Sequence, residues 1–79
     1  MPKKQVRTTA PELMMQAKGI QRGDHVRIVG TWPSRATGQV SHFAAGRPLL
    51  ANVKFDTSHV FRGNQYTYNW YEEDQLEKL

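Results

Sequence analysis

Apolar and polar residues alternate along most of the chain after residue 20, and this pattern predicts β-strands rather than helices. In the first predicted strand, Val26 and Ile28 point to one side, while His25, Arg27 and Val29 point to the other. The clearest apolar stripe lies in the third predicted strand, where four residues share one face: Leu49, Ala51, Val53 and Phe55. These positions form the predicted core.

Turn residues separate the predicted strands at the short intervals typical of an all-β domain. The second strand is expected over residues 38–43, and residues 56–59 are expected to end the third. The fourth strand is expected over residues 65–70, and residues 71–79 predict a single helical turn followed by a short last strand. The pattern therefore predicts an all-β fold with five short strands.

The chain before residue 20 follows a different pattern. Residues 1–7 are polar and basic without a period, which predicts a flexible basic tail. Thr9 and Glu12 have the spacing of a capping box, and Gly19 is a natural residue for a left-handed helix end. A short N-terminal helix is therefore expected to end at Gly19, with Leu13 on the side that docks.

Length and composition indicate one small domain and exclude several classes of protein. The 79 residues include no cysteine, which excludes disulfides and thiolate metal sites. The longest apolar runs fall far short of the roughly 20 residues of a membrane span, and the N-terminus lacks the apolar centre of a signal peptide. We expect a cytoplasmic protein with no membrane span, divided into a tail and helix over 1–19 and a strand domain over 20–79.

The formal net charge of +4 is distributed unevenly along the chain. Residues 1–35 carry seven Lys or Arg against two acidic residues, and residues 36–71 carry three against one. Residues 72–79 carry one lysine against four acidic residues. A basic body with an acidic end favours polyanionic or acidic partners, because net charge governs association.

The five strands, the loop after the first strand and the helical turn before the last resemble the SH3-like barrel over residues 20–79. One branch of that superfamily, the KOW type of ribosomal and transcription proteins, is matched by Gly-Asp-His-Val-Arg-Ile at 23–28 and by Gly-Gln-Val at 38–40. This resemblance implies a five-stranded SH3-like barrel that binds nucleic acid.

A second branch, photosystem I subunit IV, is similar at 21–23, 26–28, 38–41 and 53–55, and loosely at 69–76. It implies an accessory subunit that docks an acidic protein, with Arg27 and Lys54 at matching positions. A further likeness, at Gln-Tyr-Thr-Tyr over 65–68, is to the plasmid-borne, trimethoprim-insensitive dihydrofolate reductase, whose tetramer encloses a catalytic pore. It implies a homo-oligomer with an enzymatic function.

The candidate binding residues are cations on outward strand positions or in loops, together with one loop tryptophan: Arg27, Trp32, Arg35, Arg47, Lys54 and Arg62. Phosphates require cations, and single-stranded bases stack on aromatic faces. Tyr66, Tyr68 and Trp70 form a second stacking candidate, although aromatic residues at a period of two more often line the inner face of a strand. The first hypothesis is nucleic-acid binding through an outward basic face, and the alternative is an acidic protein partner.

Other chemistry finds little support in the sequence. His25, His42 and His59 are spaced by 17 residues, unlike a compact metal motif. The serines lack a nucleophile-elbow signature, and the glycines do not form a phosphate-binding loop. We therefore expect a non-enzymatic module without a cofactor or metal, with self-association left open.

Overall fold

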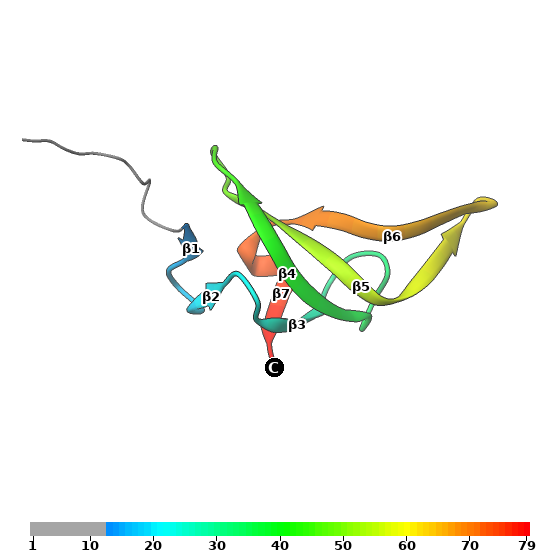
Figure 1. The fold of residues 1–79 in the computed structure, drawn as a ribbon, viewed down its shortest axis with the longest axis horizontal. Coiled ribbons are helices and arrows are strands. Elements are labelled where there is room, and N and C mark those ends of the chain that lie inside the picture. The colour runs from blue at the N-terminus through cyan, green and yellow to red at the C-terminus, as the bar shows by residue number, and fades with distance from the viewer. Residues whose placement is uncertain (1–12) are drawn as a thin grey trace, which may run out of the picture.

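The computed structural model describes residues 13–79, and this part of the chain is mostly β-structure (Figure 1). Its elements in chain order are β1 (Met14–Met15), β2 (Ile20–Gln21), β3 (His25–Ile28), β4 (Thr37–Ala44), β5 (Leu50–Phe61), β6 (Asn64–Tyr71), the 3₁₀ helix η1 (Glu73–Gln75) and β7 (Leu76–Lys78). The all-β class is confirmed, as are the helical turn and the short last strand. The capping box and the basic tail lie outside the described residues.

Five strands form one antiparallel sheet in the order β6-β5-β4-β3-β7, and β1 and β2 form a separate two-stranded sheet. The five-stranded sheet is called the main sheet below. Within residues 13–79, the sheet does not close into a barrel, because its two edge strands, β6 and β7, do not pair with each other. The closed five-stranded barrel expected from the sequence is therefore wrong.

The length and bend of β5 explain why the main sheet stays open. Residues 56–59 do not end this strand, which continues to Phe61. Between the pairs Lys54–Tyr68 and His59–Tyr66, β5 advances by five residues and β6 by two. Extra residues on one strand bend and twist the pair. Figure 1 shows the far ends of β5 and β6 reaching away from β7.

The short helix expected before Gly19 is also wrong for the described residues. Met15 pairs with Ile20 in the β1–β2 hairpin, and both side chains are buried in the core. A helix of about nine residues is unstable alone in water, whereas the hairpin buries two large apolar residues side by side. Leu13, expected on the docking side, is exposed. Gly19 does adopt the left-handed conformation, with φ of 65°, but in the hairpin turn.

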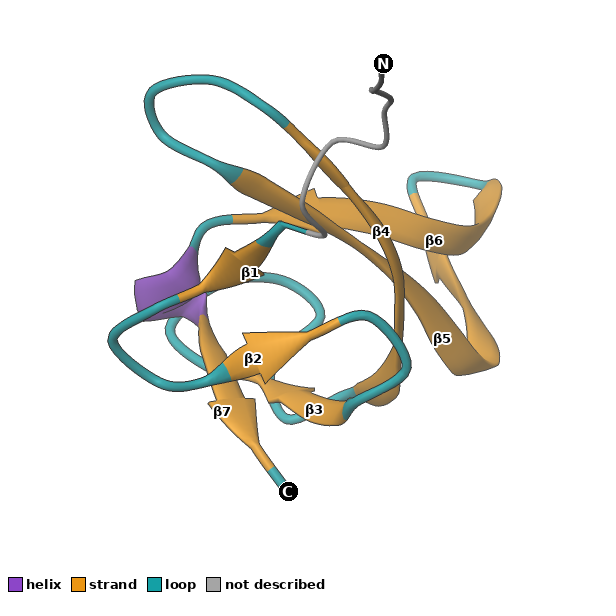
Figure 2. Cartoon of the chain, turned by 60° about the vertical axis from the view of Figure 1, so that its left-hand side comes forward, coloured by secondary structure: helices purple, strands orange, loops and turns teal. Residues whose placement is uncertain are grey.

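The β1–β2 hairpin lies beside η1 and β7 (Figure 2). The backbone N–H of Lys18 donates to the Glu73 carboxylate at 2.6 Å, and its Nζ donates to the carbonyl of Leu76 at 2.7 Å. The hairpin is therefore attached to the acidic end of the chain by polar contacts as well as by the core.

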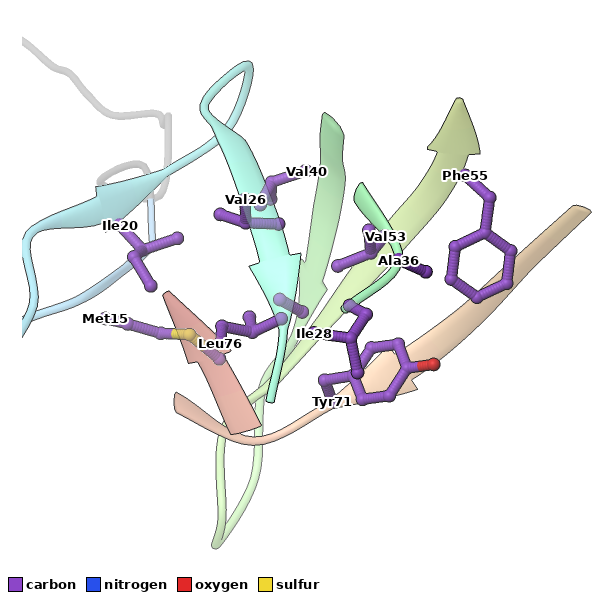
Figure 3. Packing of buried hydrophobic residues seen from close by; sticks show 11 residues of the cluster. Met15, Ile20, Val26, Ile28, Ala36, Val40, Val53, Phe55, Tyr71 and Leu76 are labelled. Atoms are coloured by element: carbon purple, nitrogen blue, oxygen red, sulfur yellow. The ribbon is translucent and has the colours of Figure 1, made fainter. Parts of the chain in front are cut away.

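The core lies between the inner face of the main sheet and the hairpin (Figure 3). Val26 and Ile28 are fully buried, as the alternation predicted. The predicted stripe is buried at Ala51, Val53 and Phe55, and its first residue, Leu49, packs against the cluster. The remaining strands contribute Val40, Tyr71 and Leu76. The predicted core stripe is thus confirmed, and it fixes which face of the main sheet points outward.

Candidate nucleic-acid interface

The outer face of the main sheet, which is turned away from the core, carries a row of polar and aromatic side chains. The strand register aligns one residue from each of four neighbouring strands: His25, Gln39, Lys54 and Tyr68. Each of them adjoins core residues in its strand or is itself exposed. Because successive residues of a strand point to opposite faces, this row lies on the outer face.

At the β6 end of the outer face, six residues line a shallow hollow of about 450 Å³, called the β6 hollow below: His42, Asn52, Lys54, Thr67, Tyr68 and Trp70. The exposed fraction is 54% for Tyr68 and 36% for Trp70. The Trp70 ring meets the His42 ring edge to face, with centroids 5.2 Å apart and an interplanar angle of 87°. This contact supports Trp70 while leaving part of the ring open to a ligand.

Asn52 is the buried polar residue of the β6 hollow. It is 6% exposed, and the register places it between His42 of β4 and Trp70 of β6. Its side chain makes no hydrogen bond with any described residue. A buried amide without a partner costs roughly 1–3 kcal/mol, and it offers two N–H donors and one carbonyl acceptor. The hollow therefore presents unused hydrogen-bonding capacity beside two aromatic rings.

Lys54 is the cation of the β6 hollow, and its side chain makes no ion pair or hydrogen bond within residues 13–79. The other basic side chains of the outer face each have an acidic partner. The Arg27 guanidinium lies 3.0 Å from the Glu77 carboxylate, and His25 Nε2 lies 2.7 Å from the Asp56 carboxylate. Positive charge that remains available on this face is therefore concentrated at its β6 end.

Asp56 keeps a negative charge on the β3 side of the outer face. Its carboxylate accepts a 2.6 Å hydrogen bond from the Thr37 hydroxyl as well as the contact with His25. These two hydrogen bonds, Thr37 first, lower the pKa of Asp56 below its ordinary value, and the charge of His25 adds to them. The carboxylate is thus ionised at neutral pH, and it disfavours an anionic ligand away from the β6 hollow.

Trp32, expected as a stacking plane, belongs to a different aromatic cluster. Its ring centroid lies 5.3 Å from that of Phe61 and 5.4 Å from that of Tyr66. The Arg62 guanidinium lies 5.3 Å from the centroid of the same Phe61 ring. Trp32 is half-buried in these contacts and attaches the first loop to the far part of the β5–β6 hairpin.

The structure does not bring the six candidate residues together. They lie in four places: Arg27 and Lys54 on the outer face, Trp32 and Arg62 around Phe61, Arg35 in the turn before β4, and Arg47 in the turn before β5. Within residues 13–79, the six residues therefore do not form a single basic face.

Sequence reasoning missed His42 and Asn52 as binding residues, and it named Tyr68 and Trp70 only as a second stacking candidate. It favoured the inner face for the aromatic residues of β6, whereas the structure buries Tyr71 of the opposite parity. A usable signal was present, because Tyr68 and Tyr71 cannot both face the core of one regular strand. Asn52 was a second signal, since it is a polar residue between two members of the core stripe.

The three histidines lie in separate surroundings. His25 contacts Asp56, His42 contacts Trp70, and His59 lies edge-on to Phe55. In the described part of the chain, no three His, Cys, Asp or Glu residues are grouped so that they could hold a metal ion.

No protein-family model, curated protein or solved structure matches this chain. Over residues 13–79, no helix has the length and apolar character to span a bilayer.

Proposed function

We propose that this protein binds single-stranded nucleic acid in the β6 hollow. The observation that carries the proposal is the buried Asn52 amide, which lacks a hydrogen-bond partner within residues 13–79 and lies beside the exposed rings of Tyr68 and Trp70. A flat heteroaromatic ring with donors and acceptors on its edge satisfies both features at once. Nucleobases have this chemistry.

Four residues of the hollow then have a role in binding: Asn52, Lys54, Tyr68 and Trp70. Tyr68 and Trp70 provide stacking surfaces, and stacking contributes roughly 1–3 kcal/mol per base. Asn52 reads a base edge through its amide, and Lys54 neutralises a backbone phosphate.

Paired strands fit the hollow less well than a single strand. A duplex hides the faces of its bases in the stack, so exposed aromatic rings gain nothing from it. Stacking tolerates all four bases, and a single amide discriminates only weakly. The proposal is therefore a preference for single strands with modest sequence selectivity.

The SH3-like resemblance also remains a proposal. Five consecutive strands, a loop after the first of them and a helical turn before the last support it. In this proposal the protein is an open variant of that architecture, in which the bend of β5 moves β6 away from β7.

Fluorescence anisotropy with labelled oligo(dT) and oligo(U), beside a duplex of equal length, tests the proposed function. Trp70→Ala is expected to weaken binding roughly 5- to 150-fold, the loss of one stacking contact. Lys54→Ala is expected to reduce the slope of log affinity against log salt by about 0.7, the value for one phosphate on a single strand.

Arg35→Ala is the matched control for Lys54→Ala, because Arg35 is also exposed and without an ion pair among the described residues but lies in the turn before β4, outside the β6 hollow. An equal reduction of the salt slope in Lys54→Ala and Arg35→Ala would contradict the assignment of the β6 hollow as the binding site. Binding to poly-glutamate without binding to either oligonucleotide would instead support the acidic protein partner.

A further inference from the structure

We infer that the open edge of β6 pairs with β6 of a second copy of this chain, in antiparallel orientation, to form one sheet across two molecules. β6 is an edge of the main sheet, and its eight residues contain no charged residue and no proline. Edge strands that stay unpaired usually carry charge, proline or a bulge that blocks pairing. β6 carries neither a charged residue nor a proline.

The backbone geometry shows which groups the β6 edge presents. Val40 directs its N–H and C=O toward the β3 side, since it donates to Asp24 at 2.9 Å and accepts from Gly23 at 2.8 Å. In an antiparallel sheet the direction alternates from residue to residue, and paired residues face each other. Gln39, next to Val40, therefore directs its backbone groups toward its partner Lys54 on β5. Val53, next to Lys54, directs its own toward its partner Asn69 on β6.

By this alternation Asn69 directs its backbone groups toward β5, and Tyr68 and Trp70 direct theirs toward the open edge. One hydrogen bond agrees with this direction: the Trp70 N–H donates to the side-chain oxygen of Asn69 at 2.9 Å. The Asn69 side chain thus provides a local acceptor for a donor that no strand within residues 13–79 reaches. A neighbouring strand can replace that acceptor without leaving a buried N–H unsatisfied.

The lack of charged residues on β6 allows a copy of β6 to be the second strand. Two molecules of net charge +4 repel each other, so self-association requires an uncharged contact surface. β6 is such a surface. The opposite edge, β7, has only three residues and carries Glu77 and Lys78, which are paired with Arg27 and Asp24. An antiparallel ladder is also self-complementary, so one strand is sufficient to build a two-fold contact.

The shape of β6 supports the same occupant. A hollow of about 420 Å³ is lined by six consecutive residues of this strand alone, 65–70. Four of the eight residues of β6 are tyrosine, tryptophan or threonine within that hollow: Tyr66, Thr67, Tyr68 and Trp70. Aromatic and threonine side chains that face each other across antiparallel strands stabilise the pairing. The strand therefore offers side-chain as well as backbone contacts to its copy.

Pairing about a two-fold axis normal to the sheet keeps both outer faces on the same side. Two copies of Tyr68 and Trp70 then lie next to each other, and the two β6 hollows form one longer surface. This consequence for ligand length rests on the proposed function, whereas the pairing itself does not.

Sedimentation velocity of the full chain over a range of concentrations, without nucleic acid, tests the pairing. The expected result is a mass that rises with concentration from 9.1 kDa to twice that value. Thr67 lies near the middle of β6, so Thr67→Lys and Thr67→Glu each place like charges near the two-fold axis. Each variant alone is expected to stay at 9.1 kDa.

An equimolar mixture of Thr67→Lys and Thr67→Glu is expected to recover the dimer, because opposite charges then face each other. A folding defect could not give this recovery, and circular dichroism of each variant checks the fold. Thr57→Lys, at an exposed threonine of β5, is the matched control and is expected to dimerise normally. A wild type that stays monomeric, or a Thr67→Lys variant that dimerises alone, would overturn the inference. Because no oligonucleotide is present, neither result depends on the proposed function.

Discussion

The Tyr71 hydroxyl donates a 2.9 Å hydrogen bond to the backbone carbonyl of Trp32, 39 residues earlier in the chain. Tyr71 ends β6 and is 2% exposed, whereas Trp32 lies in the loop between β3 and β4. The bond therefore holds the first loop against the end of β6, next to Trp70. This relationship links the stability of the sheet to the placement of the β6 hollow.

Replacement of Tyr71 by phenylalanine removes this bond and keeps the ring. We expect Tyr71→Phe to lower the free energy of unfolding by roughly 0.5–1.5 kcal/mol, the usual contribution of one hydrogen bond. Urea denaturation followed by circular dichroism measures the change. Tyr68→Phe, at the exposed ring of the same strand, is the control and is expected to change stability little. Equal losses in both variants would show that the Trp32 contact has no special role.

Tyr71 also predicts a difference at alkaline pH. Burial raises the pKa of the Tyr71 hydroxyl above 10.0, despite the opposing hydrogen bond from Asn69. In the unfolded chain the hydroxyl loses its proton near pH 10, whereas in the folded chain it loses the proton only at a higher pH. The wild-type fold therefore loses stability as pH rises from 10 through the folded pKa. The destabilisation caused by Tyr71→Phe is therefore expected to be constant below pH 10 and to shrink above it. A difference that stays constant up to pH 11 would contradict the burial of the hydroxyl.

Gly38 predicts a steric effect in the middle of the sheet. A Cβ added at this position would meet the backbone oxygen of Lys54 and would lie 2.7 Å from Cγ1 of Val53. Both atoms belong to β5, whose backbone cannot move without breaking the ladder. We expect Gly38→Ala to destabilise the fold by roughly 1–3 kcal/mol, the usual range for overpacking. Thermal unfolding of Gly38→Ala beside Ser41→Ala, an exposed position of β4, measures it, and a stable Gly38→Ala would show that β4 and β5 are less closely packed.

Asp56 gives a prediction for acidic pH. The Thr37 hydroxyl is the largest cause that lowers its pKa below 3.8, so Thr37→Val is expected to raise that pKa toward 3.8. A carboxyl with a depressed folded pKa stabilises the fold above its unfolded pKa, and this contribution is lost as pH falls through the folded value. The wild type is therefore expected to lose this stabilisation below pH 3.8, and the Thr37→Val variant is expected to lose less of it. NMR titration of the Asp56 carboxyl, with Thr57→Val as control, tests this, and an unchanged pKa in Thr37→Val would contradict it.

The sequence predicted the inner face of the sheet better than the outer face. Val26, Ile28 and Val53 are apolar at a period of two, and burial of apolar area determines their side. The β6 hollow depends instead on register between strands distant in sequence, such as Asn52 with Trp70. No local pattern contains that information.

The errors at the two ends of the fold have similar causes. Met15 and Ile20 are compatible with a helix followed by a strand, and only their joint burial favours the hairpin. The closed barrel was predicted from the number of strands, but the extra residues of β5 after Lys54 decide where β6 runs. Such bulges are set by packing between strands rather than by the composition of either one.

The proposed function requires that Trp70, and not Trp32, contacts a nucleobase, and tryptophan fluorescence separates the two residues directly. The chain has two tryptophans, so Trp32→Phe leaves Trp70 as the only one, and Trp70→Phe leaves Trp32. Titration of each variant with oligo(U) at low and high salt is expected to quench Trp70 strongly at low salt and weakly at high salt, and to leave Trp32 nearly unchanged. Quenching confined to Trp32, or no quenching of Trp70 at low salt, would contradict nucleobase binding in the β6 hollow.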